Sequence, residues 1–210
     1  MNNAELILNI YNVYNARTRE EILNNLNIAV ELGKSKKLPV DRYVTLPKVT
    51  NRSKHTVMSW FNRKSKIPLI DLCMIAKYLQ YNIFSFFTTK ENCAVTREDF
   101  LVANDYNNFH YPVDSAEIFC RAFELQYNVD KNLLIDNVEH FYGTTEEMLK
   151  HHKNERQKRI MEICNCSYHT YIAWFNRSRT DVKIPLISIC LLAVDSNVDV
   201  FYFFEVHKAE

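Results

Sequence analysis

The sequence predicts an all-α protein with two related domains of about five helices each. Residues 53–63 (SKHTVMSWFNR) return as residues 167–177 (SYHTYIAWFNR), and seven of the eleven positions are identical. Each block is followed by Ile-Pro-Leu, at 67–69 and 184–186, and later by a pair of phenylalanines. Apolar residues recur at helical spacing, and no strand-like alternation stands out. A duplicated helical domain therefore organises the chain.

Composition places the chain among soluble globular proteins. Of its 210 residues, 47% are hydrophobic and 24% are charged. No run approaches the roughly 18 to 20 consecutive apolar residues that a membrane helix needs. The N-terminus also lacks the basic start and cleavage site of a secretory signal. We therefore expect a cytoplasmic protein with no membrane partner.

The six cysteines are expected to be reduced, as is usual in a cytosolic chain of this size. Cys164 and Cys166, with His169 nearby, form the grouping that comes nearest to a metal site. Zinc sites usually separate paired cysteines by two residues and add a second ligand pair, and neither feature is present. We expect no metal and no cofactor.

Positive charge is concentrated around the two repeated blocks, although the net charge of the chain is only +1. Residues 42–66 contain seven basic side chains and no acid. Residues 150–183 contain eight basic side chains and three acids. Two positive faces on an otherwise acidic body suit a polyanion bound at defined places, or are two solvated surfaces.

The first two helices of each copy follow from the spacing of apolar residues. The first is expected at residues 3–14 and again at 115–127, where apolar side chains recur every three or four positions. The second is expected at 18–32, with Thr18 as its N-terminal cap, and again at 130–142. The duplication therefore extends well beyond the most similar block.

The only two glycines of the protein, Gly33 and Gly143, follow the second helix of each copy. A left-handed residue that closes a helix is a common reason to need glycine, because glycine has no Cβ. We expect both glycines to end their helices in this way.

A tight turn between two helices is expected next in each copy. Residues 41–50 and 155–164 have helical spacing, and each is followed by an asparagine, Asn51 or Asn165. Asparagine tolerates positive φ better than any residue except glycine. Serines then stand where an N-terminal cap is needed, at Ser53 and Ser167. Helix, turn and capped helix together are typical of a helix-turn-helix motif.

The helix after the turn is expected to bury one tryptophan in each copy, Trp60 and Trp174. Another helix is expected after it, with Pro68 or Pro185 in its first turn, where the missing amide costs nothing. Residues 96–103 are expected to form a short helix within a segment that has no counterpart in the other copy. The predicted domains are 1–88 and 115–210, joined by a partly helical linker at 89–114.

This arrangement of motif and core residues resembles the Cro and phage-repressor helix-turn-helix family, also called Xre-like. The resemblance lies in the order Leu46, Val57, Trp60, Asn62, then Ile-Pro-Leu and a further apolar helix. It covers about residues 18–87 and, more loosely, 130–204. It implies a sequence-specific transcriptional regulator, an activator or a repressor, that binds double-stranded DNA. The tandem domains would then form a covalent pseudo-dimer.

The resemblance also implies which residues contact DNA, since the second helix of the motif enters the major groove in that family. In copy one, the positions that face base edges are Lys54, His55, Met58 and Ser59, next to the cap Ser53. Those that face phosphates are Arg52, Asn62, Arg63, Lys64 and Lys66. In copy two, the corresponding set is Tyr168, His169, Ile172, Arg177, Arg179 and Lys183.

Copy two leaves a second class of function open. Its base-facing positions are poor in hydrogen-bond donors, so its cations could hold DNA as a clamp, or the copy could bind a protein or a second copy of the chain. The alternative function is therefore a protein-binding adaptor or inhibitor that reuses the fold. We expect no enzyme, because two glycines cannot supply a phosphate-binding glycine loop and no catalytic triad pattern is recognisable.

Overall fold

A computed structural model describes residues 2–35, 40–62, 64–90, 93–105, 114–142 and 146–207, apart from the side chains of 146–154. Within these ranges the ordered segments are α-helices and short 3-10 helices, without a strand. The predicted all-α class is confirmed. The predicted arrangement of the copies as a pseudo-dimer stays a prediction.

The chain divides into two units whose limits fall inside helices. The N-terminal unit comprises Asn9–Cys120, and the C-terminal unit comprises Met1–Leu8 with Arg121–Glu210. The limits therefore lie within α1 (Asn3–Asn15) and α7 (Ser115–Asn128), the first helices of the two copies. These units differ from the predicted domains 1–88 and 115–210, since the first turns of α1 pack among C-terminal residues. For example, Asn3 donates a hydrogen bond of 2.7 Å to Asp199.

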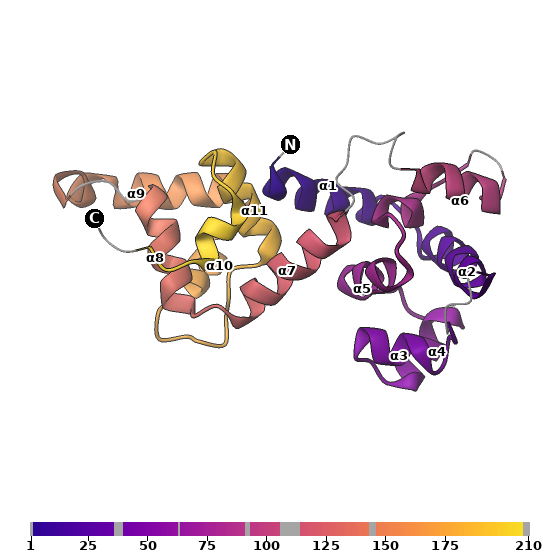
Figure 1. The fold of residues 1–210 in the computed structure, drawn as a ribbon. Helices are drawn as coiled ribbons and strands as arrows, with labels where there is room; N and C mark the ends of the chain where they lie inside the picture. The colour runs from indigo at the N-terminus through magenta and orange to yellow at the C-terminus, as the bar shows by residue number, and fades with distance from the viewer. Residues whose placement is uncertain are drawn as a thin grey trace. The chain divides into compact units, whose positions relative to one another are not determined.

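The N-terminal unit places its helices around an aromatic core. After α1 come α2 (Arg19–Ser35), α3 (Thr45–Thr50), α4 (Lys54–Phe61), α5 (Leu69–Leu79), the 3-10 helix η1 (Ile83–Phe87) and α6 (Arg97–Asn104) (Figure 1). The most deeply buried large side chains include one from each of α4, η1 and α6, namely Trp60, Phe86 and Phe100.

The predicted short helix before the second copy is confirmed as α6, and it belongs to this core. Thr96 and Asp99 form a reciprocal capping box at its start. Phe100 is fully buried, and its ring centroid lies 5.3 Å from Tyr81 and 5.6 Å from Phe86 in edge-to-face contacts. Through Phe100, α6 therefore belongs to the core of the N-terminal unit.

The C-terminal unit repeats the element order of the first. It contains α7 from Arg121 onward, α8 (Lys131–Tyr142), α9 (Glu146–Ile163), α10 (Tyr168–Phe175), α11 (Leu186–Asp195) and the 3-10 helix η3 (Val200–Phe204). Its buried side chains occupy positions equivalent to those of copy one, among them Trp174, Ile184, Cys190 and Phe203. The duplication seen in the sequence is therefore a duplication of structure.

In both copies, a buried asparagine on the second helix donates hydrogen bonds to backbone carbonyls at the end of the aromatic 3-10 helix. Asn25 donates from Nδ2 to the carbonyls of Phe86 (3.0 Å) and Thr88 (2.8 Å). Asn137 donates in the same way to Phe203 (3.1 Å) and Glu205 (2.9 Å). The sequence offered no separate signal for this contact, because helical periodicity alone does not mark a polar residue as buried.

Asn25→Ala is expected to lower the free energy of unfolding by about 1–3 kcal/mol, because it leaves two carbonyl oxygens without their donor. Urea unfolding followed by circular dichroism measures the change. Asn24→Ala is the control, since Asn24 makes one long bond of 3.4 Å to the Val95 carbonyl in a partly exposed position. Equal losses in the two variants would contradict the role of Asn25.

Gly33 does not have the predicted role. It lies inside α2, is buried and has no positive φ. A Cβ at this position would lie 3.0 Å from Cγ2 of Val40 and 3.2 Å from Cδ2 of Leu79, so glycine allows close packing here. Among the described residues, those with a left-handed backbone are Asn51, Gln80, Asn165 and Asn197. Gly143 is outside the described residues.

Candidate nucleic-acid interface

The predicted turn between two helices is present in copy one. α3 ends at Asn51, which is left-handed with φ 52° and ψ 38°. The Oγ of Ser53 accepts a hydrogen bond of 3.1 Å from the amide of Thr56 and so caps α4. α3 is shorter than predicted, because Asp41 Oδ1 accepts from the amides at 43 and 44 and makes a turn there. Pro47 consequently stands in the first turn of α3, where proline is tolerated.

Copy two has the same turn. Asn165 after α9 is left-handed with φ 46°. The Oγ of Ser167 accepts a hydrogen bond of 3.2 Å from the amide of Thr170 and caps α10. Tyr171 and Trp174 are buried below the helix, as Val57 and Trp60 are below α4. Each copy therefore presents the outer face of a short capped helix.

The outer face of α4 carries most of the residues predicted to face bases. Lys54, His55 and Met58 are exposed. Lys54 Nζ lies 5.9 Å from the ring centroid of the exposed Tyr43, a distance that allows a cation–π contact. Ser59 is half-buried, and its Oγ lies 2.5 Å from Ser65 Oγ. Three of the four predicted positions are therefore accessible.

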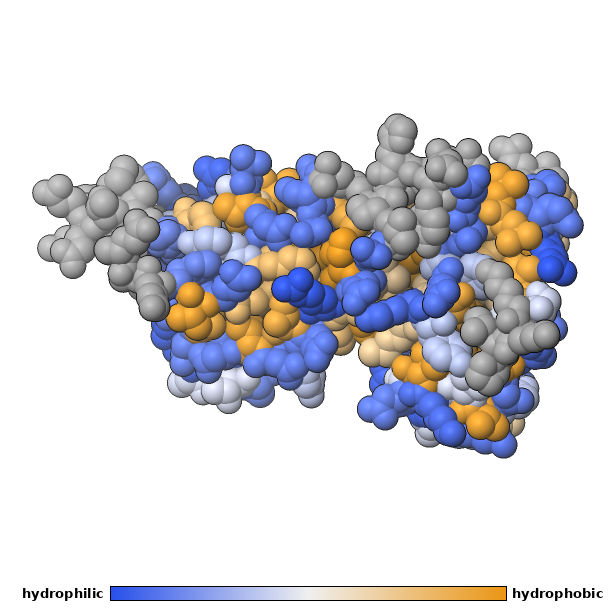
Figure 2. Space-filling model, in the orientation of Figure 1, coloured by the Kyte–Doolittle hydropathy of each residue, from blue (hydrophilic) through white to orange (hydrophobic). Residues whose placement is uncertain are grey.

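The cations around α4 differ in what they contact. Lys64 and, on α3, Lys48 are exposed, with no ion-pair partner within the described ranges. Asn62 is exposed as well, and Arg63 lies outside the described residues. In Figure 2, the surface formed by α3 and α4 at the lower right mixes hydrophilic and hydrophobic residues. The sequence prediction had not included Lys48.

Lys66, predicted to face phosphate, instead closes the end of α1. Its Nζ donates to the carbonyls of Tyr14 (3.1 Å) and Arg17 (3.0 Å) and lies 4.0 Å from the Tyr14 ring centroid. Burial lowers the pKa of this lysine. A cation at a helix C-terminus satisfies free carbonyls and interacts favourably with the helix dipole. Lys66 therefore stabilises the unit.

Lys183 has the equivalent position and the equivalent contacts in copy two. Its Nζ donates to the carbonyls of Tyr127 and, at 3.2 Å, Val129, at the end of α7. This repeated contact explains why both copies have a lysine directly before Ile-Pro-Leu.

Arg52 forms an ion pair with Asp71, a residue that the sequence did not mark as functional. Its Nε lies 3.1 Å and 3.0 Å from the two carboxylate oxygens of Asp71 on α5. The Asp71 side chain is 1% exposed and that of Arg52 is 44% exposed. Burial raises the pKa of Asp71, and the adjacent guanidinium opposes that shift.

The predicted DNA-binding arginines of copy two are paired with acids. Arg177 Nη2 lies 2.6 Å from Asp136 and 3.0 Å from Glu139. Arg179 lies 3.4 Å from Asp181. Ion pairing of this kind lowers the positive potential that a phosphate would meet. These two arginines are therefore less available to a phosphate than unpaired cations would be.

The outer face of α10 is uncharged and partly apolar. Tyr168 is 51% exposed and Ile172 is 42% exposed, and His169 between them is also exposed. Lysine at position 54 of copy one corresponds to tyrosine at position 168. The two copies therefore present helices of the same geometry with different chemistry.

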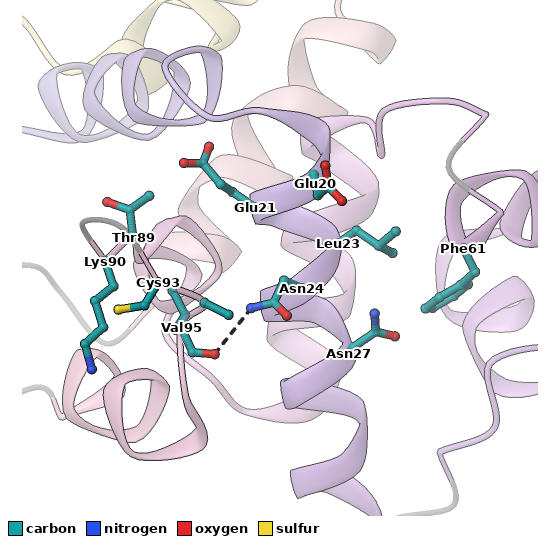
Figure 3. Close-up of a pocket in the computed structure, with 11 residues that line it drawn as sticks. Glu20, Glu21, Leu23, Asn24, Asn27, Phe61, Thr89, Lys90, Cys93 and Val95 are labelled. Carbon is teal, nitrogen blue, oxygen red and sulfur yellow. Dashed lines mark hydrogen bonds between the residues drawn. The ribbon is translucent and has the colours of Figure 1, made fainter.

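A cleft of about 470 Å3 in the N-terminal unit is lined by residues of α2 and by residues 89, 90 and 93–95 (Figure 3). In Figure 3, Glu20 and Glu21 lie towards the top of the view, Phe61 from α4 lies to the right of α2, and Thr89 and Cys93 lie to its left. Lys90 lies on a further side and pairs with Asp99 at 3.1 Å. This set contains no recognisable nucleophile-and-base pair.

The described residues support neither a metal site nor a reactive thiol at Cys164 or Cys166. No group of three or more His, Cys, Asp or Glu side chains among them is arranged to hold a metal ion. Burial raises the pKa of Cys164 to about 12 and also raises that of Cys166, which disfavours the reactive thiolate. In the same ranges, no helix is both long enough and apolar enough to cross a membrane.

Comparison with known proteins gives no family assignment. No family model matches the chain, and no curated protein or solved structure gives a significant match.

Proposed function

We propose that this protein is a sequence-specific, double-stranded DNA-binding transcriptional regulator in which α4 of copy one is the principal reading helix. One observation carries the proposal. A capped helix after a left-handed turn exposes Lys54, His55 and Met58, flanked by exposed lysines at 48 and 64 that have no acidic partner within the described residues. Short helices of this kind enter the major groove.

The chemistry of the α4 face suits both parts of DNA recognition. Lys54 can donate to O6 and N7 of guanine, and the Met58 side chain can contact the methyl group of thymine. His55 offers a ring nitrogen as donor or acceptor. Lys48 and Lys64 supply charge for the phosphates, which positions the protein without reading sequence. The division between reading and positioning residues therefore follows the chemistry of the side chains.

Copy two supports a different contribution to the same function. Its arginines are paired with acids, and α10 offers few donors, so we propose that it adds little to base reading. The alternative function, a protein-binding adaptor, draws on the exposed Tyr168 and Ile172 of this copy. Binding of a protein or of a second chain there is compatible with DNA binding by copy one.

A selection from a random duplex pool, read by sequencing, tests the proposal on the full chain. We expect one enriched half-site of a few base pairs, since only α4 combines exposure with donors. A motif with two halves would indicate that both copies read DNA, as in the predicted pseudo-dimer. Absence of any enriched motif, together with no binding of a mixed-sequence duplex, would contradict the proposal and favour the adaptor.

A further inference from the structure

The ion pair between Arg52 and Asp71 leaves the outer edge of a guanidinium unused. Both contacts to the carboxylate come from Nε, at 3.1 Å and 3.0 Å. The two terminal Nη groups have no hydrogen bond within the part of the chain that the structure describes, and the side chain is 44% exposed. Arg52 stands in the turn directly before α4, next to the cap Ser53.

Copy two provides an internal comparison, because it lacks both partners. The equivalent positions are Cys166 and Ser188. The turn nevertheless keeps its geometry: φ is 46° at Asn165 and 52° at Asn51. The serine caps also match, with bonds of 3.2 Å in copy two and 3.1 Å in copy one. The ion pair is therefore not needed to form the turn.

A buried carboxylate is costly to keep when the fold does not need it. Removing Asp71 from water disfavours its charged form, and one ion pair often fails to recover that cost. Copy two has neither residue, and Asp71 without Arg52 would be a buried charge with no partner, so we treat the two residues as a unit. The Arg52–Asp71 pair occurs only in copy one, the copy with the cationic helix. A role other than forming the turn would account for this.

We propose that Asp71 is a positioning residue that holds Arg52 so that its two terminal Nη groups contact a phosphate of the DNA backbone beside α4. The inference rests on the proposed DNA-binding function. A guanidinium carries its donors in a rigid planar fork that matches two phosphate oxygens. Asp71 holds that fork before DNA arrives, so less side-chain entropy is lost on binding.

The variant Asp71→Asn distinguishes a positioning role from a purely electrostatic effect, because the two predict opposite changes in DNA affinity. Removing a negative charge close to a bound polyanion should strengthen binding if charge alone matters. Loss of positioning should weaken it, and we expect an affinity about three- to tenfold lower. Arg52→Ala should lose about tenfold or more, and the slope of log K against log salt should fall by about 0.9. Adding Asp71→Asn to Arg52→Ala should cause little further loss, because the two residues form one unit.

Fluorescence anisotropy with the full chain and a labelled duplex, at several salt concentrations, measures these effects. The duplex carries the selected motif, or is a mixed sequence if no motif is enriched. Glu98→Gln is the matched control, because it removes the same charge from an exposed site on α6 of the same unit. Circular dichroism checks folding. Should Asp71→Asn not fold, Asp71→Ser takes its place, because copy two has a serine at the equivalent position 188, and the same loss of affinity, about three- to tenfold, is expected.

The outcomes distinguish the inference from the function on which it rests. Weaker binding by Asp71→Asn, with Glu98→Gln unchanged or slightly tighter, supports the positioning role. Binding by Asp71→Asn at least as tight as that of the wild type overturns the positioning role, and an unchanged salt slope for Arg52→Ala overturns the phosphate contact. Either result leaves the DNA-binding proposal intact. A wild-type chain that binds neither duplex overturns both.

Discussion

Reversing two charges around α4, in Lys54→Glu with Lys64→Glu, is expected to lower DNA affinity by at least about 100-fold. Each lysine is exposed, and neither has an acidic partner within the described ranges. A charge-assisted contact contributes about 1.5–3 kcal/mol, and reversal adds repulsion from the phosphates. Titration of a labelled duplex at low and moderate salt measures the loss. The salt dependence should also become shallower, because fewer counterions are released.

The control for this variant changes the net charge by the same amount on helices other than α4. Arg97→Glu with Lys158→Glu alters exposed residues on α6 and α9 that form no ion pair in the described part of the chain. We expect it to bind nearly as the wild type does. If both double variants lost affinity to the same degree, attraction would come from net charge, and α4 would not be the reading helix.

Trp60→Ala is expected to lower the free energy of unfolding of the N-terminal unit by about 3–5 kcal/mol, because truncating a buried tryptophan leaves a large cavity. Trp60 is 1% exposed and anchors α4 to the core. DNA binding should be lost together with the ordered helix. Urea unfolding followed by circular dichroism measures stability, and the fluorescence of the remaining Trp174 reports on the C-terminal unit separately.

Phe61→Ala serves as the comparison for Trp60→Ala, since Phe61 is the next residue on the same helix but is only half-buried. The decrease in the free energy of unfolding should be clearly smaller for Phe61→Ala than for Trp60→Ala. A cost for Trp60→Ala no greater than that for Phe61→Ala would show that the core does not depend on the tryptophan. The corresponding change Trp174→Ala should destabilise copy two while copy one stays folded.

The sequence predicted the local structure of the motif well, because local chemistry determines it. Asn51 and Asn165 adopt positive φ, and Ser53 and Ser167 cap the helices that follow. These contacts involve residues within a few positions of one another, so spacing alone identifies them. The repeat strengthened each prediction, since the same signals occurred twice. DNA binding itself stays a proposal.

Residue roles that depend on distant partners did not follow from the sequence. Lys66 and Lys183 were predicted to face phosphate, but they bind carbonyls about fifty positions earlier in the chain. Arg177 was placed on the same surface, yet it pairs with Asp136 and Glu139 on α8. A basic residue near a motif has the same appearance in sequence whether it is free or paired.

The sequence by itself determined the duplication, the helical class and the capped turn, all of which follow from periodicity and from the conformational preferences of single residues. Only the tertiary structure decided which cations remain accessible, why Gly33 is small and that Asp71 holds Arg52. The physical reason is that pairing and burial depend on segments far apart in the chain. Helical spacing specifies one face of a helix, and the fold specifies what lies opposite it.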